Sequence, residues 1–167
     1  MFTLRQSLGW AVTPLFVAVL FWPVSTLTLT NRTNGSNVGW LPLPATFDVS
    51  YRHSIIGQQG NERFQTTRDG IRLVQIISRS GAVIDYYARA ERPHETASGY
   101  VINVIEPNLL SLPIKVSSLG DRSIRVGDDV VHLARLVPDG DTVELSTGLV
   151  PRIAVLISAA MLKATGA

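Results

Sequence analysis

The chain has 167 residues, a formal net charge of +2, 46% hydrophobic residues and 17% charged residues. This length is enough for one compact domain plus an appendage, and a charged fraction below the roughly 25% usual for soluble domains favours a membrane segment. The Lys and Arg residues are scattered, which argues against the basic stripe that nucleic-acid binding needs. The absence of cysteine excludes disulfides, thiol catalysis and Cys-ligated metals.

The first predicted element is an uncharged apolar stretch from Leu8 to Thr28. Its length matches the roughly 20 helical residues that cross a bilayer core, and Trp10 and Trp22 lie toward its ends, where such rings favour the interface. We therefore predict that residues 1–29 form a membrane anchor or signal segment. A retained anchor is favoured over a cleaved signal peptide, because the stretch ends without a good small-residue cleavage site; a buried core helix is the third alternative.

The orientation of the predicted membrane span follows from the position of one charge, and the nature of the segment after it follows from its composition. Arg5, the charge that precedes the apolar stretch, favours an N-terminus on the inner side. The prediction is thus a single span in the cytoplasmic membrane, with the domain on the periplasmic or extracellular side. Residues 30–45 are rich in Asn, Gly, Ser and Pro and are predicted to be a linker.

Residues 47–55 alternate between apolar and polar side chains, which is typical of a half-buried strand. Phe47, Val49, Tyr51 and His53 share its apolar face. Turn residues follow at 57–61, so residues 62–67 are expected to return as the hairpin partner.

Further short apolar runs predict more strands separated by turns, at residues 71–77, 82–87, 100–105, 110–116, 124–126, 130–137 and 142–145. Residues 89–99 are predicted to be a loop. This spacing predicts an all-β domain over residues 46–148, either an antiparallel sandwich or a partly open barrel, preceded by the N-terminal hydrophobic helix. Residues 149–167 are predicted to be a C-terminal strand and extension, with the strand at 152–157 and a helical continuation at 158–163.

His53 is a candidate functional residue because it lies on an apolar face. If Ile55 pairs with Glu62 and His53 with Phe64, then Glu62 shares the face of His53. A His–carboxylate pair in an apolar sheet suits a ligand site, a proton switch or part of a metal site. The simpler alternative is a structural hydrogen-bonded pair at the end of the sheet, since buried polar groups need partners.

No catalytic machinery is predicted. Ser54 and His53 are neighbours on a strand and point to opposite faces, so they do not form a nucleophile–base pair with Asp85 as the orienting acid. The sequence contains no Gly-x-Ser-x-Gly, Walker or dinucleotide-binding motif. Its clustered aspartates fit tight turns better than a calcium loop. We therefore predict that the chain is not an enzyme and has no cofactor and no metal site.

The stretch from Phe47 to Ser54, followed by Glu62 in the return strand and Gly81 after the next strand, resembles a bacterial domain-of-unknown-function family, the one numbered eighteen-fifty. The ending is similar too, with Gly127, then residues 133–136 and the turn at 138–140. The resemblance covers residues 47–145. The chain departs from the family after Gly81, where the family tends to have a further Gly and Pro and this sequence predicts a strand.

The resemblance implies a small exported or anchored protein, of a kind often encoded beside tripartite ATP-independent periplasmic (TRAP) transporters of the TAXI type. It also implies that the residues marked in the family, which we predict to bind a ligand, are Tyr51, His53, Ser54, Glu62 and Gly81. The leading hypothesis is a non-enzymatic accessory domain that contacts the transporter permease or its solute-binding protein. The alternatives are a small-ligand or metal-binding module centred on His53 and Glu62, and a structural envelope protein.

Overall fold

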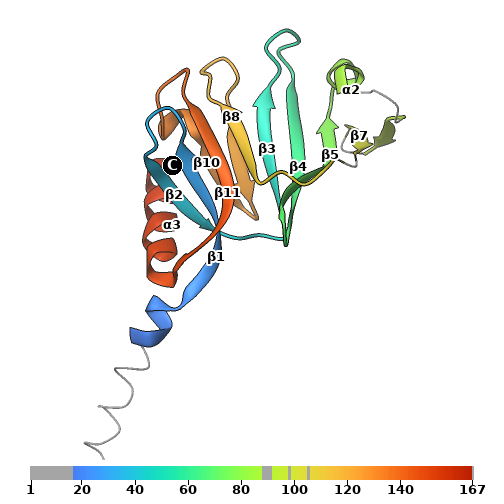
Figure 1. The fold of residues 1–167 in the computed structure, drawn as a ribbon. Helices are drawn as coiled ribbons and strands as arrows, with labels where there is room; N and C mark the ends of the chain where they lie inside the picture. The colour runs from blue at the N-terminus through green and yellow to red at the C-terminus, as the bar shows by residue number, and fades with distance from the viewer. Residues whose placement is uncertain (1–16, 88–91, 98, 105, 167) are drawn as a thin grey trace, which may run out of the picture.

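The computed structural model describes residues 17–87, 92–97, 99–104 and 106–166. The described chain is mostly β, in two open antiparallel sheets, which confirms the predicted class (Figure 1). Sheet A has the order β2 (Asn37–Pro42), β1 (Pro23–Asn31), β11 (Thr142–Pro151) and β8 (Ser111–Lys115). Sheet B has the order β10 (Asp129–His132), β9 (Ser123–Val126), β3 (Thr46–Arg52), β4 (Gln59–Thr67), β5 (Gly70–Ser78), β7 (Gly99–Asn103) and β6 (His94–Thr96).

The main core lies between sheet A and the β10–β9–β3–β4 part of sheet B. Alternate residues of each strand point into it, as the period of two requires. The rings of Phe47 and Phe64, which are paired across β3 and β4, stack at 5.3 Å between centroids. Sheet A contributes Leu27, Leu29, Val143 and Leu145, and sheet B contributes Val49 and Ile124, all at most 1% exposed.

Helix α3 (Arg152–Gly166) covers part of sheet A by packing along β2 (Figure 1). The close approach depends on Gly39, where an added Cβ would lie 3.0 Å from the Ser158 hydroxyl and 3.1 Å from Leu162. The Ser158 Oγ accepts a 2.6 Å hydrogen bond from the Trp40 backbone N–H. Buried Val155, Ser158 and Leu162 follow a helical spacing, so the helix uses one face to seal the sheet.

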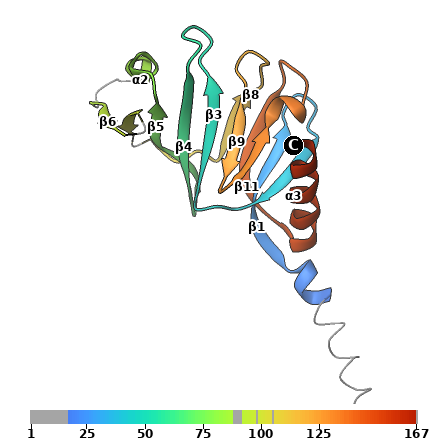
Figure 2. The same ribbon diagram turned by 180° about the vertical axis from the view of Figure 1, so that it is seen from behind.

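A second, smaller core lies under helix α2 (Gly81–Tyr87) and consists of Ile76, Ile84 and Ile102. Figure 2 shows α2 and sheet A at opposite ends of the molecule. The prediction of a strand at 82–87 is therefore wrong. The segment forms a helix that packs Ile84 on Ile76 and Ile102, and the adjacent Val83 and Ile84 are both fully buried on the side of the helix that faces the sheet.

The predicted boundary between the N-terminal segment and the domain also needs correction. Residues 23–29 belong to β1, which pairs along its whole length with β11, from Pro23 opposite Pro151 to Asn31 opposite Val143. The predicted linker, residues 30–45, contains the end of β1 and all of β2. Its polar composition hid a strand because β2 is short and only Gly39 and Leu41 are buried.

The C-terminal prediction is partly wrong. Residues 152–157 continue into α3 as helix instead of forming a strand, and the helical continuation at 158–163 belongs to the same helix. The β-branched residues there favoured a strand by propensity, but the helical face that packs on β2 overrides it. The predicted loop at 89–99 contains the short strand β6, and residues 88–91 and 98 lie outside the described residues.

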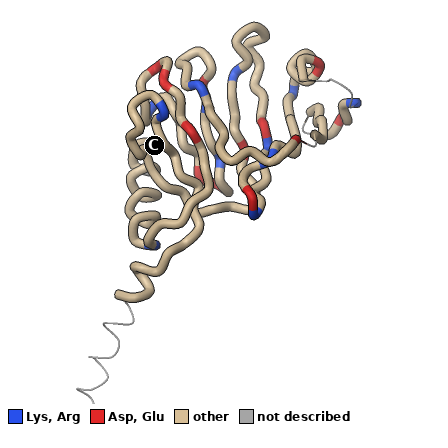
Figure 3. The backbone as a smooth tube through the Cα atoms, viewed as in Figure 1, with Lys and Arg blue, Asp and Glu red and all other residues tan. Residues whose placement is uncertain are grey.

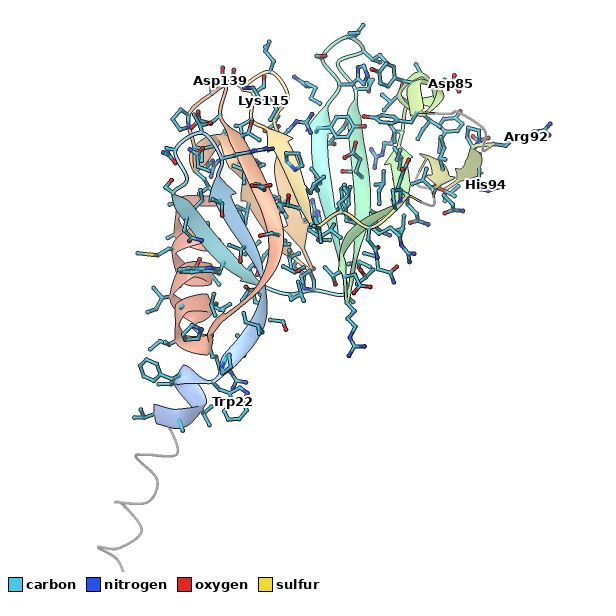
Figure 4. The ribbon with its side chains drawn as sticks, viewed as in Figure 1. Trp22, Asp85, Arg92, His94, Lys115 and Asp139 are labelled. Atoms are coloured by element: carbon cyan, nitrogen blue, oxygen red, sulfur yellow. The ribbon has the colours of Figure 1, made fainter. Side chains whose placement is uncertain are left out.

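Most of the predicted N-terminal helix lies outside the described residues. Within its described part, residues 17–21 are helical. Trp22 follows this turn at the start of β1, at the end of the molecule far from α2 (Figure 4). Among the helices that the structure describes, none combines the length and the apolar character that crossing a membrane requires.

Candidate functional site

The β3–β4 hairpin places the predicted site residues. The sequence predicts Ile55 opposite Glu62, whereas the structure pairs Val49 with Glu62 and Tyr51 with Gly60. The predicted register is wrong because residues 53–58 form a loop instead of extending the strands. The two registers differ by an even number of residues, so Glu62 still lies on the same face as Tyr51.

Tyr51 and Glu62 belong to a polar cluster on the inner face of sheet B, completed by Tyr87 from α2 and Arg122 from the segment before β9. The Tyr51 and Tyr87 rings meet edge to face at 6.4 Å. The Arg122 guanidinium carbon lies 5.5 Å from the centre of the Tyr51 ring, a distance at which the cation and the ring attract each other. The site therefore combines one carboxyl group, one guanidinium and two phenols, which come from β3, β4, α2 and the segment before β9.

The Tyr51 hydroxyl is the least satisfied group of this cluster. It is buried and makes no hydrogen bond of good geometry, although the Tyr87 hydroxyl lies near enough to influence it. The ring crosses toward Gly60, where an added Cβ would lie 2.6 Å from the hydroxyl oxygen. A buried hydroxyl without a partner costs about 1–3 kcal/mol, so its position calls for an explanation beyond packing.

Burial dominates the acid–base behaviour of the cluster. It raises the pKa of the Glu62 carboxyl, while the positive charge of Arg122 and the nearby Tyr87 hydroxyl lower it in part. Burial, with help from Tyr87 and Glu62, also raises the pKa of the Tyr51 phenol far above its usual value. The phenols therefore stay neutral donors, and Glu62 takes up a proton more readily than an exposed glutamate does.

His53 lies at the start of the hairpin loop and is 8% exposed. Its ring packs edge to face on Tyr86 at 5.0 Å, and its Nδ1 accepts long, 3.4 Å hydrogen bonds from the backbone N–H groups of Ile55 and Ile56. These contacts shape the loop and dock it against α2. They account for the burial of the ring without a ligand.

The remaining two predicted residues are less involved. Ser54 is exposed in the loop. Gly81 begins α2, and a Cβ added there would meet the Tyr100 ring at an ordinary 3.7 Å. Four of the five predicted residues thus gather around α2, but only Tyr51 and Glu62 enter the polar cluster.

The residues singled out for catalysis or metal binding do not come together in the described part of the chain. Asp85 is exposed on α2 (Figure 4) and is not bonded to His53. Among the residues that the structure describes, no group of three or more His, Asp or Glu side chains could hold a metal ion. The Tyr51–Glu62–Tyr87–Arg122 cluster instead brings together hydrogen-bonding groups and two groups of opposite charge.

Sequence reasoning misses two members of the cluster, Tyr87 and Arg122. Tyr87 follows a segment predicted as a strand, and a strand would not bring its ring to Tyr51. Arg122 precedes a predicted strand at 124–126, and alternation alone places it on the face of buried Ile124. The two-residue spacing between Arg122 and Ile124 was therefore enough to predict the face of the sheet on which Arg122 lies. The residues that Arg122 contacts depend on the pairing of β9 with β3, which the sequence does not give.

Comparison with known proteins adds no relative, because no family model, no curated protein and no solved structure matches the chain. The resemblance to the domain-of-unknown-function family therefore stays a prediction.

Proposed function

We propose that this chain is a non-enzymatic binding domain that takes a small carboxylic acid at the Tyr51–Glu62–Tyr87–Arg122 cluster. The observation that carries the proposal is the buried Tyr51 hydroxyl, which has no hydrogen-bond partner of good geometry, under the Arg122 guanidinium. The Arg122 guanidinium and the neutral phenol hydroxyls of Tyr51 and Tyr87 together offer the donors that a carboxylate accepts. A ligand carboxylate would satisfy both groups at once.

The alternative ligand of opposite charge, an amine, fits the cluster less well. Tyrosine rings beside a carboxyl group attract ammonium groups in general. Here Arg122 already holds the position over the Tyr51 ring and partly offsets the charge of Glu62. An amine would meet a like charge there, which opposes its binding.

The pH should control binding through Glu62. An ionised Glu62 repels a carboxylate, and a protonated Glu62 becomes a further donor. Because burial raises the Glu62 pKa, the protonated form becomes populated above the usual range of a glutamate. Carboxylate binding should therefore strengthen as the pH falls toward that raised pKa, until the ligand itself takes up a proton.

Two charge variants test this site. We expect Arg122→Gln to weaken binding of acetate and succinate at least tenfold at every pH, because the main counter-charge is lost. We expect Glu62→Gln to bind at least as well as the parent chain, with a flat pH profile. The measurement is calorimetric or NMR titration of the full chain in mild detergent between about pH 5 and 8. No binding of either acid to the parent chain, or an unchanged pH profile in Glu62→Gln, argues against the proposal.

A third variant separates a binding role of Tyr51 from a structural one. We expect Tyr51→Phe to keep or raise the free energy of unfolding, by up to about 1 kcal/mol, because it removes an unsatisfied buried hydroxyl. The same change should weaken acetate binding several-fold. Tyr86→Phe is the matched control, since Tyr86 is 68% exposed; it should alter neither quantity. A Tyr51→Phe chain that is destabilised and binds normally would assign the hydroxyl a purely structural role.

The proposed setting of this domain is the outer side of the cytoplasmic membrane, where it assists or regulates a TAXI-type TRAP transporter. The family resemblance supports this setting, and so does the surface just before β1. Val17, Val19, Phe21 and Trp22 are 43–66% exposed, which is unusual for large apolar side chains in water. They continue the apolar stretch of the sequence toward the N-terminus.

Membrane attachment and the transporter link are tested together by fractionation and co-purification. We expect the full chain to sediment with membranes and to carry a transporter permease or solute-binding protein with it in mild detergent. The matched control is a chain that lacks residues 1–21, which should stay in the soluble fraction. A full chain that remains in the supernatant after membranes are removed contradicts the setting, and leaves the proposed ligand site untouched.

A further inference from the structure

The outer face of sheet B carries a polar hollow of about 650 Å³. It lies on the opposite face of β3 and β4 from the Tyr51–Glu62 cluster, because Asp48 and Ser50 alternate with the buried Phe47, Val49 and Tyr51. Its volume falls in the range of sites for small organic molecules, roughly 300–1,000 Å³. Its walls are mainly polar, in contrast to the apolar core on the other side of the sheet.

The charge of this hollow is unbalanced. Arg63, Arg79 and Arg125 line it together with one acid, Asp48, which leaves a formal excess of two positive charges. Asp48 is already engaged, since Arg63 donates to both of its carboxylate oxygens at 2.7 and 3.0 Å. In the part of the chain that the structure describes, neither Arg79 nor Arg125 has an ion-pair partner, although Arg125 lies directly across from Asp48 in the strand register.

Neutral hydrogen-bonding groups complete the lining. The Ser50 hydroxyl donates to Asn61 Oδ1 at 2.6 Å, which leaves the Asn61 amide N–H groups as donors. Gln58 and Gln59 add further amides at the end nearest the hairpin loop. The donors therefore surround the unpaired arginines and come from β3, β4 and β9 and from the residue after β5.

We propose that this hollow binds a small oxyanion that carries two negative charges, such as a phosphate ester or a dicarboxylate. Two unpaired guanidinium groups match two negative charges, and guanidinium–oxyanion hydrogen bonds are among the strong ones. Arg125 projects from β9 and Arg79 follows the last residue of β5, so the backbone of sheet B sets the positions from which both side chains reach the hollow.

A solvated polar face is the simpler explanation of most charged sheet surfaces. On this molecule acidic and basic positions are interspersed (Figure 3), and such a face normally pairs its charges or spreads them. The hollow instead concentrates three arginines around one acid that is already bonded. This local excess, in a concave site of sufficient volume, distinguishes it from the rest of the surface.

The test is an NMR titration of the full chain in mild detergent with inorganic phosphate at low ionic strength. We expect saturable shifts confined to the hollow, with a dissociation constant of about 1 mM or tighter. Arg125→Gln and Arg79→Gln should each weaken binding at least tenfold. Arg68→Gln, an exposed change in the β4–β5 turn with the same loss of charge, should leave it unchanged. An equal loss in Arg68→Gln overturns the proposal, because it would indicate attraction to net charge alone.

Titrations with different anions distinguish a phosphate ester from a dicarboxylate as the ligand. Glycerol phosphate that binds and succinate that does not indicates a phosphate ester, and the reverse indicates a dicarboxylate; either supports a dianion site. Acetate that shifts the signals of the hollow as tightly as both, or no shift of those signals with any of the ligands, overturns it. Arg122→Gln, on the other face, should not alter phosphate binding, so this outcome is independent of the carboxylate site proposed above.

Discussion

A fragment that begins at Thr46 is expected to remain unfolded, whereas one that begins at Trp22 is expected to fold with nearly full stability. The sequence alone placed the start of the domain at residue 46, so the two fragments set the predicted boundary against the observed one. The measurement is urea unfolding followed by circular dichroism, with one-dimensional NMR to report side-chain packing.

The reason is that β1 is an internal strand of sheet A. It pairs with β11 on one side and with β2 on the other. Leu27 and Leu29 are fully buried, and Leu41 of β2 is 4% exposed. Shortening one such leucine to alanine costs about 2–5 kcal/mol, so losing all three costs about 6–15 kcal/mol, as much as the whole stability of a typical domain, about 5–15 kcal/mol.

A matched pair of point variants in the longer fragment isolates the core contribution from the loss of chain. Leu29→Ala should lower the free energy of unfolding by about 3 kcal/mol. Thr28→Ala, the half-buried neighbour on the other face of β1, should lower it by less than about 1 kcal/mol. A cooperative unfolding transition in the fragment that begins at Thr46 would show that β1 is dispensable.

This boundary illustrates what the sequence could not supply. No charged residue separates the apolar stretch from β1, so the absence of charge cannot separate residues for lipid from residues for a protein core. The separation comes from β11, whose residues 143–151 accept β1 along their whole length. Pairing between strands so far apart along the chain depends on the tertiary structure and cannot be predicted from local sequence.

Alternation predicted β3 and β4 well, because one face of each is buried and the other is solvated. It failed at 82–87 and 152–157, where apolar residues suited either strand or helix and packing decided. In α2 the deciding contact is Ile84 on Ile76 and Ile102. Short apolar runs of this kind are ambiguous without their partners.

The candidate site shows the same division. Tyr51 and Glu62 were identified together because parity survives a register error of an even number of residues. Arg122 and Tyr87 join them only through the β9–β3 pairing and the helical form of α2. The outer hollow follows from the same alternation, since Asp48 and Ser50 are the polar half of β3, but the unpaired state of Arg79 and Arg125 depends on the fold.

The second large effect is expected for Gly70→Ala, which should lower the free energy of unfolding by about 2–6 kcal/mol. Gly70 begins β5 with a φ of +134°, a conformation that side chains rarely adopt, and such strain costs about 1–3 kcal/mol. An added Cβ would also lie 2.2 Å from the Leu109 carbonyl oxygen. Since a backbone atom cannot rotate away, overpacking adds a further cost of about 1–3 kcal/mol.

The Leu109 carbonyl is fixed by a two-way bridge. It accepts from Ile71 N at 2.9 Å, and Leu109 N donates to Ile71 O at 2.7 Å. Moving the carbonyl away from the new methyl group breaks this bridge next to Ile71, which is fully buried in the main core. Moving the carbonyl to relieve the clash therefore exposes core surface. Whether the chain keeps the clash or breaks the bridge, the variant is less stable than the parent chain.

Gly57→Ala is the control that separates the two costs. Gly57 also has a positive φ, of +70°, but nothing lies within 4 Å of an added Cβ, so only the conformational cost of about 1–2 kcal/mol remains. Both substitutions restrict the unfolded chain alike, so that contribution cancels in the comparison. Equal losses of stability in the two variants would mean that the approach of Leu109 to Gly70 does not constrain the fold. A loss in Gly70→Ala that is larger by more than about 1 kcal/mol, the difference between the two conformational costs, places the constraint at this contact.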